Sequence, residues 1–210
     1  VTNQSDKTLS LTDKKLSESP FLSSGIGGIL HIASSYSSRF NEVILQLPKG
    51  RSLKGINVSA NRGQTSITNA SLENATLNTN SYILRIKGSR IKNSKLTTPN
   101  IVNIFDTDLT DSQLESTEKH FRAENIKVYG KVELSSKNAL SIMLTQKESQ
   151  EINLDLSSHH GPIYQLSRDE SQRHPNELSN PYKTEKTDAK GQLIAKADDY
   201  ISLETAANRP

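Results

Sequence analysis

The chain has 210 residues, of which 32% are hydrophobic, and its net charge is +3 at neutral pH. It contains no cysteine, which excludes disulfides, zinc–thiolate sites and thiol nucleophiles. No apolar run approaches the roughly 20 residues that cross a bilayer, so we expect no transmembrane segment.

Residues 1–28 are polar and predict a flexible N-terminal segment. In residues 29–50, apolar side chains recur at spacings that place them on one helical face. They are Leu30, Ala33, Phe40, Val43, Ile44 and Leu47. Pro48 and Gly50 would end this helix. We expect it to cap the repeats that follow, because an open coil exposes unpaired backbone groups.

From residue 65 onward, an aliphatic residue returns at every fifth position, with a small residue two places before most of them. The aliphatic residues are Ile67, Leu72 and Leu77, then Ile86, Ile91, Leu96 and Ile101, then Ile104, Leu109 and Leu114. A period of five fits neither a helix nor a simple strand. It fits a coil that turns a corner every five residues.

In such a coil, each short side directs one aliphatic side chain into a thin core and places a small residue at the corner. The first set predicts six inward residues: Thr65, Ile67, Ala70, Leu72, Ala75 and Leu77. The sets start at Ile67, Ile86 and Ile104, close to four sides of five residues, and such internal periods are typical of solenoids. A left-handed helix built on sixes requires aliphatic residues six apart followed by Gly, which this stretch lacks.

The repeats resemble those of the pentapeptide-repeat proteins, in which a small residue, a polar residue and Leu or Phe precede two variable positions. The matching units are TSITN, ASLEN, ATLNT, SRIKN, SKLTT, TDLTD and SQLES. The match covers roughly residues 51–118, and it departs from the family in lacking Phe centres and in often having Ser or Thr where Asp or Asn is usual. The resemblance implies a mainly β fold, a right-handed quadrilateral β-helix.

Beyond residue 118 the five-residue period is no longer clear. Segments of alternating apolar and polar residues at 125–134, 139–144 and 152–156 predict strands. We therefore assign the β-helix to residues 51–158, with its clearest repeats at 65–118. Residues 159–210 are rich in charged residues, Ser, Asn and Pro, and predict an irregular polar linker. Within it, residues 192–204 carry enough apolar side chains to regain order.

The sequence shows no recognisable catalytic constellation. His159 and His160 are adjacent, so they would point in different directions, and no further metal ligand stands at a recognised spacing. No nucleophile elbow is present. Asp106, Asp108 and Asp111 could act as paired carboxylates on a polysaccharide, but solvated faces are the simpler interpretation. We expect a protein that is not an enzyme and needs no cofactor or metal.

Positive charge is concentrated in residues 51–100, where eight Lys and Arg stand against Glu73 alone. Lys87, Arg90, Lys92 and Lys95 flank inward positions, so all four are predicted to point outward as a candidate binding group for phosphates. The same register stacks Arg90 on Asp108 and Lys92 on Glu73, which favours structural ion pairs. No aromatic residues alternate with them, so nucleic acid is an unfavoured partner.

The resemblance also implies a function. One branch of the pentapeptide-repeat proteins imitates DNA and needs an acidic surface, which the basic repeats contradict. Another comprises secreted bacterial effectors, including HECT-like ubiquitin ligases with a degenerate β-helix ahead of a catalytic lobe. This branch implies secretion, including delivery into a host cell, and binding of a host or partner protein. The alternatives are a carbohydrate-binding or carbohydrate-active domain and, more weakly, binding to an anionic membrane surface through the basic coil.

Overall fold

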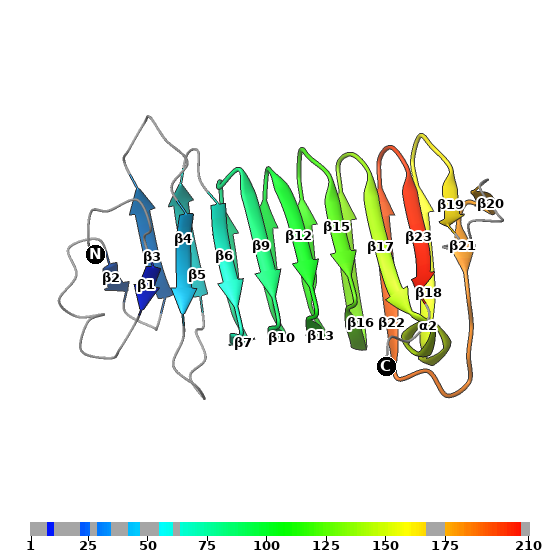
Figure 1. Cartoon of the computed structure of the whole chain (residues 1–210), viewed down its shortest axis with the longest axis horizontal. Helices are drawn as coiled ribbons and strands as arrows, with labels where there is room; N and C mark the ends of the chain where they lie inside the picture. The colour runs from blue at the N-terminus through cyan, green and yellow to red at the C-terminus, as the bar shows by residue number, and fades with distance from the viewer. Residues whose placement is uncertain are drawn as a thin grey trace.

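The computed structural model describes residues 64–166 and 175–206 in full, together with the backbone of strands at 8–10, 22–25, 29–34, 42–46 and 55–60. In its central part, each coil of the chain adds one strand to each of three sheets, named A, B and C here. Figure 1 shows these strands side by side along the longest axis of the molecule. The fold is therefore mainly β and solenoid-like.

Sheet A contains, in spatial order, β1 (Thr8–Ser10), β4 (Glu42–Gln46), β6 (Gln64–Thr68), β9 (Ile83–Lys87), β12 (Ile101–Phe105), β15 (Phe121–Glu124), β17 (Leu140–Thr145), β23 (Ile201–Ala206), β19 (Ile163–Leu166) and β20 (Asn176–Leu178). Sheet B contains β2 (Leu22–Gly25), β3 (Ile29–Ser34), β5 (Gly55–Ala60), β8 (Thr76–Thr79), β11 (Lys95–Thr98), β14 (Gln113–Ser116), β16 (Lys127–Ser136), β22 (Gly191–Ala197), β18 (Ile152–Ser158) and β21 (Tyr182–Lys183). Sheet C contains β7 (Ser71–Glu73), β10 (Arg90–Lys92), β13 (Asp108–Thr110) and the first part of β16. Pairing is parallel except at the ends, where β2, β20 and β21 run antiparallel to their neighbours.

The core is a narrow column of stacked aliphatic side chains. Of the six residues that the period of five predicts to point inward, Ala70 is the most exposed, at 6%, and Leu72 and Leu77 are at 0%. The parallel register stacks like on like: Leu72 lies beside Ile91, and Leu77 beside Leu96. The prediction of the inward residues is confirmed.

Small polar residues at the corners satisfy backbone groups where the chain leaves a strand. The Ser94 hydroxyl accepts a hydrogen bond from the Ala75 amide (3.0 Å) and donates one to the Lys92 carbonyl (2.6 Å). Ser89 makes the corresponding pair of bonds at the other corner of the same coil, and Ser112 makes it one coil further along. A buried hydroxyl with both bonds made carries no desolvation penalty for a missing partner, which explains why Ser recurs at this position.

At the two corners that flank sheet C, the chain turns through a left-handed backbone conformation that Asn, Asp and Gly adopt most readily. One corner holds Asn69, Gly88, Asp106 and Asn125, and the other holds Asn74, Asn93, Asp111 and Gly130, with φ between 44° and 60° throughout. The sequence carries this signal as an Asn, Asp or Gly at a fixed place in the five-residue unit, and it marks the corners independently of the aliphatic period.

Gly130→Ala should destabilise the fold by about 1–2 kcal/mol, because an alanine is strained at φ +60°. Its Cβ would also overlap the Asp111 carboxylate, which accepts a hydrogen bond from the Lys131 amide at 2.9 Å. Urea denaturation measures the change. The matched control is Asn93→Gly, which places glycine at the same corner and should change stability far less. Equal effects of the two substitutions would contradict this account.

The helix predicted over residues 29–50 is wrong, because the structure has strands β3 and β4 there. Both pair in parallel with the following coil: Leu30 aligns with Ile56, and Val43 and Leu45 align with Thr65 and Ile67. Apolar residues at these positions fit a helical face as well as a strand. Strands form here because each segment can pair with a neighbouring strand, and such tertiary context commonly determines β structure.

The solenoid extends beyond residues 51–158 in both directions. The segment 1–28, predicted to be flexible, contributes β1 and β2. The irregular linker predicted for 159–210 is also wrong where the structure describes it, since β19 to β23 lie there. Leu193, Ile201 and Leu203 are buried in the core column. Strands predicted at 125–134, 139–144 and 152–156 are confirmed as β16, β17 and β18.

A single-turn helix, α2 (Gln146–Glu151), closes the end of sheet C beside β16 (Figure 1). Its buried Glu148 carboxylate accepts a hydrogen bond from the Val128 amide at 2.7 Å. The Lys190 ammonium lies 2.7 Å from Glu148 and 2.8 Å from Glu151. An unpaired strand edge is a site for unwanted pairing. Helix α2 caps this edge, and the ion pairs with Lys190 hold the helix in place.

Candidate binding surface

The four predicted binding residues all point outward, but the structure separates them. Lys87 lies on β9 in sheet A, Arg90 and Lys92 lie on β10 in sheet C, and Lys95 lies on β11 in sheet B. All four are exposed. They surround one coil on three faces, so one flat partner cannot contact all of them together.

On sheet C, the two stacked ion pairs expected from the register are confirmed. Arg90 Nε lies 3.8 Å from Asp108 Oδ2, and Lys92 Nζ lies 2.9 Å from Glu73 Oε1. The hydrogen bond with Glu73 also raises the pKa of Lys92. Lys127 Nζ lies 3.9 Å from the other oxygen of Asp108. Exposed pairs such as these add little stability, but they neutralise much of the charge of this face.

Lys95 lines a shallow groove of about 620 Å³ along the corner between sheets C and B. Most residues around the groove have polar or charged side chains; besides Lys95 they are Asn74, Ala75, Thr76, Asn93, Ser94, Asp111, Ser112, Gln113, Lys131 and Glu133. Lys131 pairs with Glu133 at 2.7 Å. Within the fully described residues, Lys95 has no carboxylate within ion-pair distance. The groove therefore offers amides, hydroxyls and one uncompensated cation.

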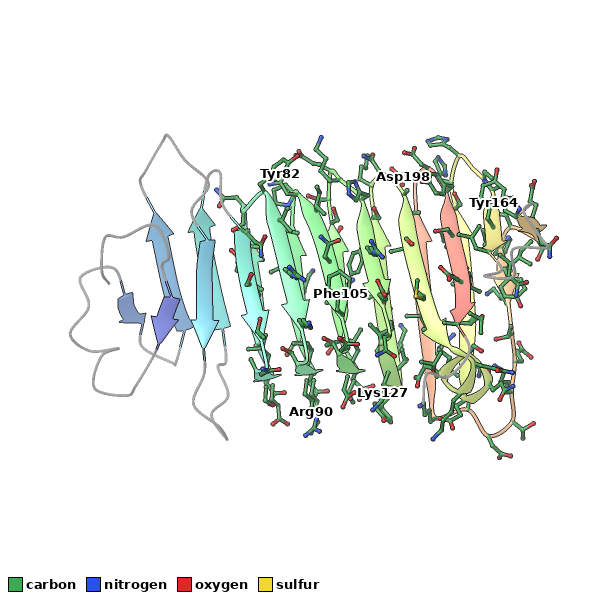
Figure 2. All side chains as sticks on the ribbon, in the orientation of Figure 1. Tyr82, Arg90, Phe105, Lys127, Tyr164 and Asp198 are labelled. Carbon is green, nitrogen blue, oxygen red and sulfur yellow. The ribbon has the colours of Figure 1, made fainter. Side chains whose placement is uncertain are left out.

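A second group of side chains gathers around Phe105 on sheet A. The Arg85 guanidinium lies 5.4 Å from the centre of the Phe105 ring, and that of Arg122 lies 5.8 Å from it. Both distances allow cation–π attraction. Figure 2 shows Phe105 near the middle of this face, far from Arg90 and Lys127 at the edge where sheet C lies. An outward aromatic ring is thus held between two cations.

The charge of this group is only partly compensated. Arg122 pairs with Glu124 at 2.8 Å. Among the residues described in full, neither Arg85 nor Lys87 has a carboxylate within ion-pair distance. Lys87 aligns with Phe105 in the register, so it belongs to the same cluster. We call Arg85, Lys87, Phe105 and Arg122 the basic–aromatic surface.

Phe105 and Arg122 were not among the predicted binding residues. The signal was available, because the spacing that stacked Arg90 on Asp108 also stacks Lys87 on Phe105. Arg85 aligns with Asn103, which aligns with Arg122. Residues that are close in sequence belong to one coil and lie on different faces, whereas residues of successive coils lie side by side on one sheet. The surface therefore combines residues of three successive coils.

The carboxylates considered for catalysis do not form a pair. Asp106 accepts a hydrogen bond from the Asn125 amide (2.6 Å) at one corner, and Asp111 stands at the other corner. Asp108 lies between them and is bound by Arg90 and Lys127. All three therefore have structural partners.

His159 and His160 stack edge to face with ring centres 4.1 Å apart. Within residues 64–166 and 175–206, no three His, Asp or Glu side chains gather closely enough to hold a metal ion. In the same part of the chain, no helix is long and apolar enough to cross a bilayer.

Comparison with known proteins identifies one family. The family model described as Toastrack DUF4097 matches residues 1–204. The searches of curated proteins and of solved structures found no match. The family match agrees with a β-rich, solenoid-like fold, whereas the resemblance to secreted effectors stays a prediction. Since the match spans nearly all of the sequence, the chain belongs to the Toastrack DUF4097 family.

Proposed function

We propose that this chain is a non-enzymatic binding module whose basic–aromatic surface holds an acidic segment of a protein partner. The observation that carries the proposal is the placement of Phe105 between Arg85 and Arg122 on an open sheet face. Arg and aromatic side chains dominate the binding energy of protein interfaces. Here the ring also keeps the two guanidinium groups in place before a partner arrives.

A protein partner fits this surface better than nucleic acid does. Among the described outward residues of β12 and of its neighbours β9 and β15, Phe105 is the one aromatic ring, so successive bases would find no stacking platform there. A carboxylate can accept two parallel hydrogen bonds from a guanidinium, and the Phe105 face offers contact for an apolar neighbour of that carboxylate. We therefore expect an acidic peptide with interspersed apolar residues to bind, and to bind less tightly as salt increases.

The test compares two double variants with the same change in charge on different faces of one coil. Arg85→Ala/Lys87→Ala removes two cations from sheet A, and Arg90→Ala/Lys92→Ala removes two from sheet C. The probe is a library of acidic and scrambled-charge peptides, measured by fluorescence anisotropy. We expect the sheet A variant to weaken binding of acidic peptides at least tenfold, and the sheet C variant to change it less than threefold.

Two outcomes would contradict the proposal: no peptide binding by the unaltered chain, or equal losses in both variants. Circular dichroism spectra that match the unaltered chain would show that each variant is folded. Liposomes containing anionic lipid form a parallel arm. Binding to them that is lost on charge reversal at Lys87 and Arg90, without peptide binding, would favour the membrane-surface alternative.

A carbohydrate ligand is the second candidate, and the polar side chains that line the groove around Lys95 support it. Asn74 and Asn93 repeat there from coil to coil, at the separation of neighbouring strands, about 4.8 Å. Amides at regular intervals can donate to and accept from successive hydroxyl groups. Glycan binding without peptide binding would favour this function over the first.

Two features implied by the pentapeptide resemblance remain part of the proposal. One is secretion, including delivery into a host cell, which fractionation of an expressing culture would test. The other is a right-handed coil with four corners. Right-handed winding is the rule for parallel connections, and the strandless residues 80–82 would form the fourth side. A crystal structure would test the winding.

A further inference from the structure

The last coils of the solenoid are not stacked in chain order. Along sheet B the strands lie in the order β16, β22, β18, although β18 precedes β22 in the sequence. Along sheet A the order is β17, β23, β19, although β19 precedes β23. Strands β22 and β23 therefore fill a slot between elements formed earlier in the chain. Figure 1 shows this for the red β23, which lies between the yellow-green β17 and the yellow β19.

The slot cannot stay open in water. All residues of β22 pair with β16 on one side and with β18 on the other. Leu193, Ala195 and Ile201, which β22 and β23 place in the core, are each 0% exposed. Removing these strands would uncover the core column and leave four unpaired strand edges, which readily bind another strand. Only strands with this sequence and register restore every contact.

Residues 184–190 connect β21 to β22, and side chains of this connector hold the start of β22 by contacts outside the slot. The Lys186 ammonium donates hydrogen bonds to the carbonyls of Ser149 and Ile152 at the end of α2. Lys190, the last residue before β22, pairs with Glu148 and Glu151. These contacts keep residues 184–190 against α2 and lie outside the slot. The slot's own pairing does not depend on which chain the connector comes from.

We propose that the slot is an interface with a second copy of this chain, in which two copies exchange β22 and β23. A terminal element that fills a slot in its own chain fills the identical slot in another copy with the same contacts, and such exchange is a low-cost route to dimers. The sequence separation favours it, since β22 returns to β16 only after β17, α2, β18, β19, β20 and β21. During that interval the slot is open to a neighbouring chain.

The test uses the 210-residue chain with one cysteine introduced per copy, because this sequence contains none. Ser135 and Lys196 are register partners on β16 and β22, and both point outward. Adjacent strands lie about 4.8 Å apart, within the range a disulfide spans. A mixture of S135C and K196C chains is unfolded in denaturant, refolded at several concentrations and oxidised. Exchange predicts an interchain disulfide between positions 135 and 196, found by mass spectrometry, with a several-fold larger yield at tenfold higher concentration.

A mixture of E115C and S135C chains is the matched control. Glu115 and Ser135 are also register partners, but their strands β14 and β16 are not exchanged, so this mixture should give no interchain disulfide above background. The S157C and K196C pair repeats the test on the other wall of the slot. The proposal is overturned if neither K196C mixture links chains at any concentration while the double variant S135C/K196C forms its bond within one chain.

Discussion

Leu72→Asp should unfold the solenoid, with a loss of stability of more than about 4 kcal/mol. Leu72 is 0% exposed and lies beside Ile91 in the stacked column. A carboxylate at this position would lose its hydration and gain no ionic partner, since its neighbours are aliphatic. Each coil supports the next, so the damage should spread along the column. Far-UV circular dichroism and urea denaturation measure the loss.

Two controls separate the buried charge from simpler effects. Leu72→Ala removes the side chain without adding charge and should cost about 2–5 kcal/mol. Glu73→Ala changes the adjacent outward residue and removes only the exposed pair with Lys92, so it should cost less than about 1 kcal/mol. If the Leu72→Asp chain unfolded at the same urea concentration as the unaltered chain, the inward position of residue 72 would be refuted.

The sequence was most informative where the core is one side chain wide. A side of five residues places only Leu72 and the small Ala70 inward, so the aliphatic period appears directly in the sequence. The period is interrupted after Leu77, where Thr79 and Ser81 are the buried residues, joined by a hydrogen bond of 2.8 Å. Polar residues can fill this part of the column because their hydroxyls bond to each other. A search for aliphatic residues alone could not find them.

The predictions that the structure did not bear out share one physical cause, which is the pairing of residues that are distant in sequence. Strands β3 and β4 pair with strands of the next coil, and no local pattern separated strand from helix there. The pairing of β16 with β22 joins residues about 60 positions apart, so a polar composition after residue 159 could not reveal it. The basic–aromatic surface was missed for the same reason, because Arg85, Phe105 and Arg122 belong to three successive coils.

Lys190→Met should cost about 3–5 kcal/mol, because it leaves the Glu148 carboxylate buried without its cation. Burial disfavours the charged form of Lys190, but hydrogen bonds with Glu148 and Glu151 outweigh this effect and raise its pKa. The bond with Lys190 also lowers the pKa of Glu151. Urea denaturation of the single and double variants in a Lys190→Met, Glu148→Gln cycle measures the coupling between the two groups.

Glu148→Gln/Lys190→Met is the decisive control, because an amide can still accept the hydrogen bond from Val128 without needing a cation. We expect the double variant to be more stable than Lys190→Met alone, and additive losses would contradict the ion pair. The pH dependence gives an independent check. Because folding raises the pKa of Lys190, its contribution to stability is fully present below pH 10.5 and is lost as the pH rises through the folded pKa. Because folding lowers the pKa of Glu151, its contribution is fully present above pH 4.5 and is lost as the pH falls through the folded pKa. Since both shifts require the Lys190 ammonium, Lys190→Met should weaken the pH dependence of stability at both ends.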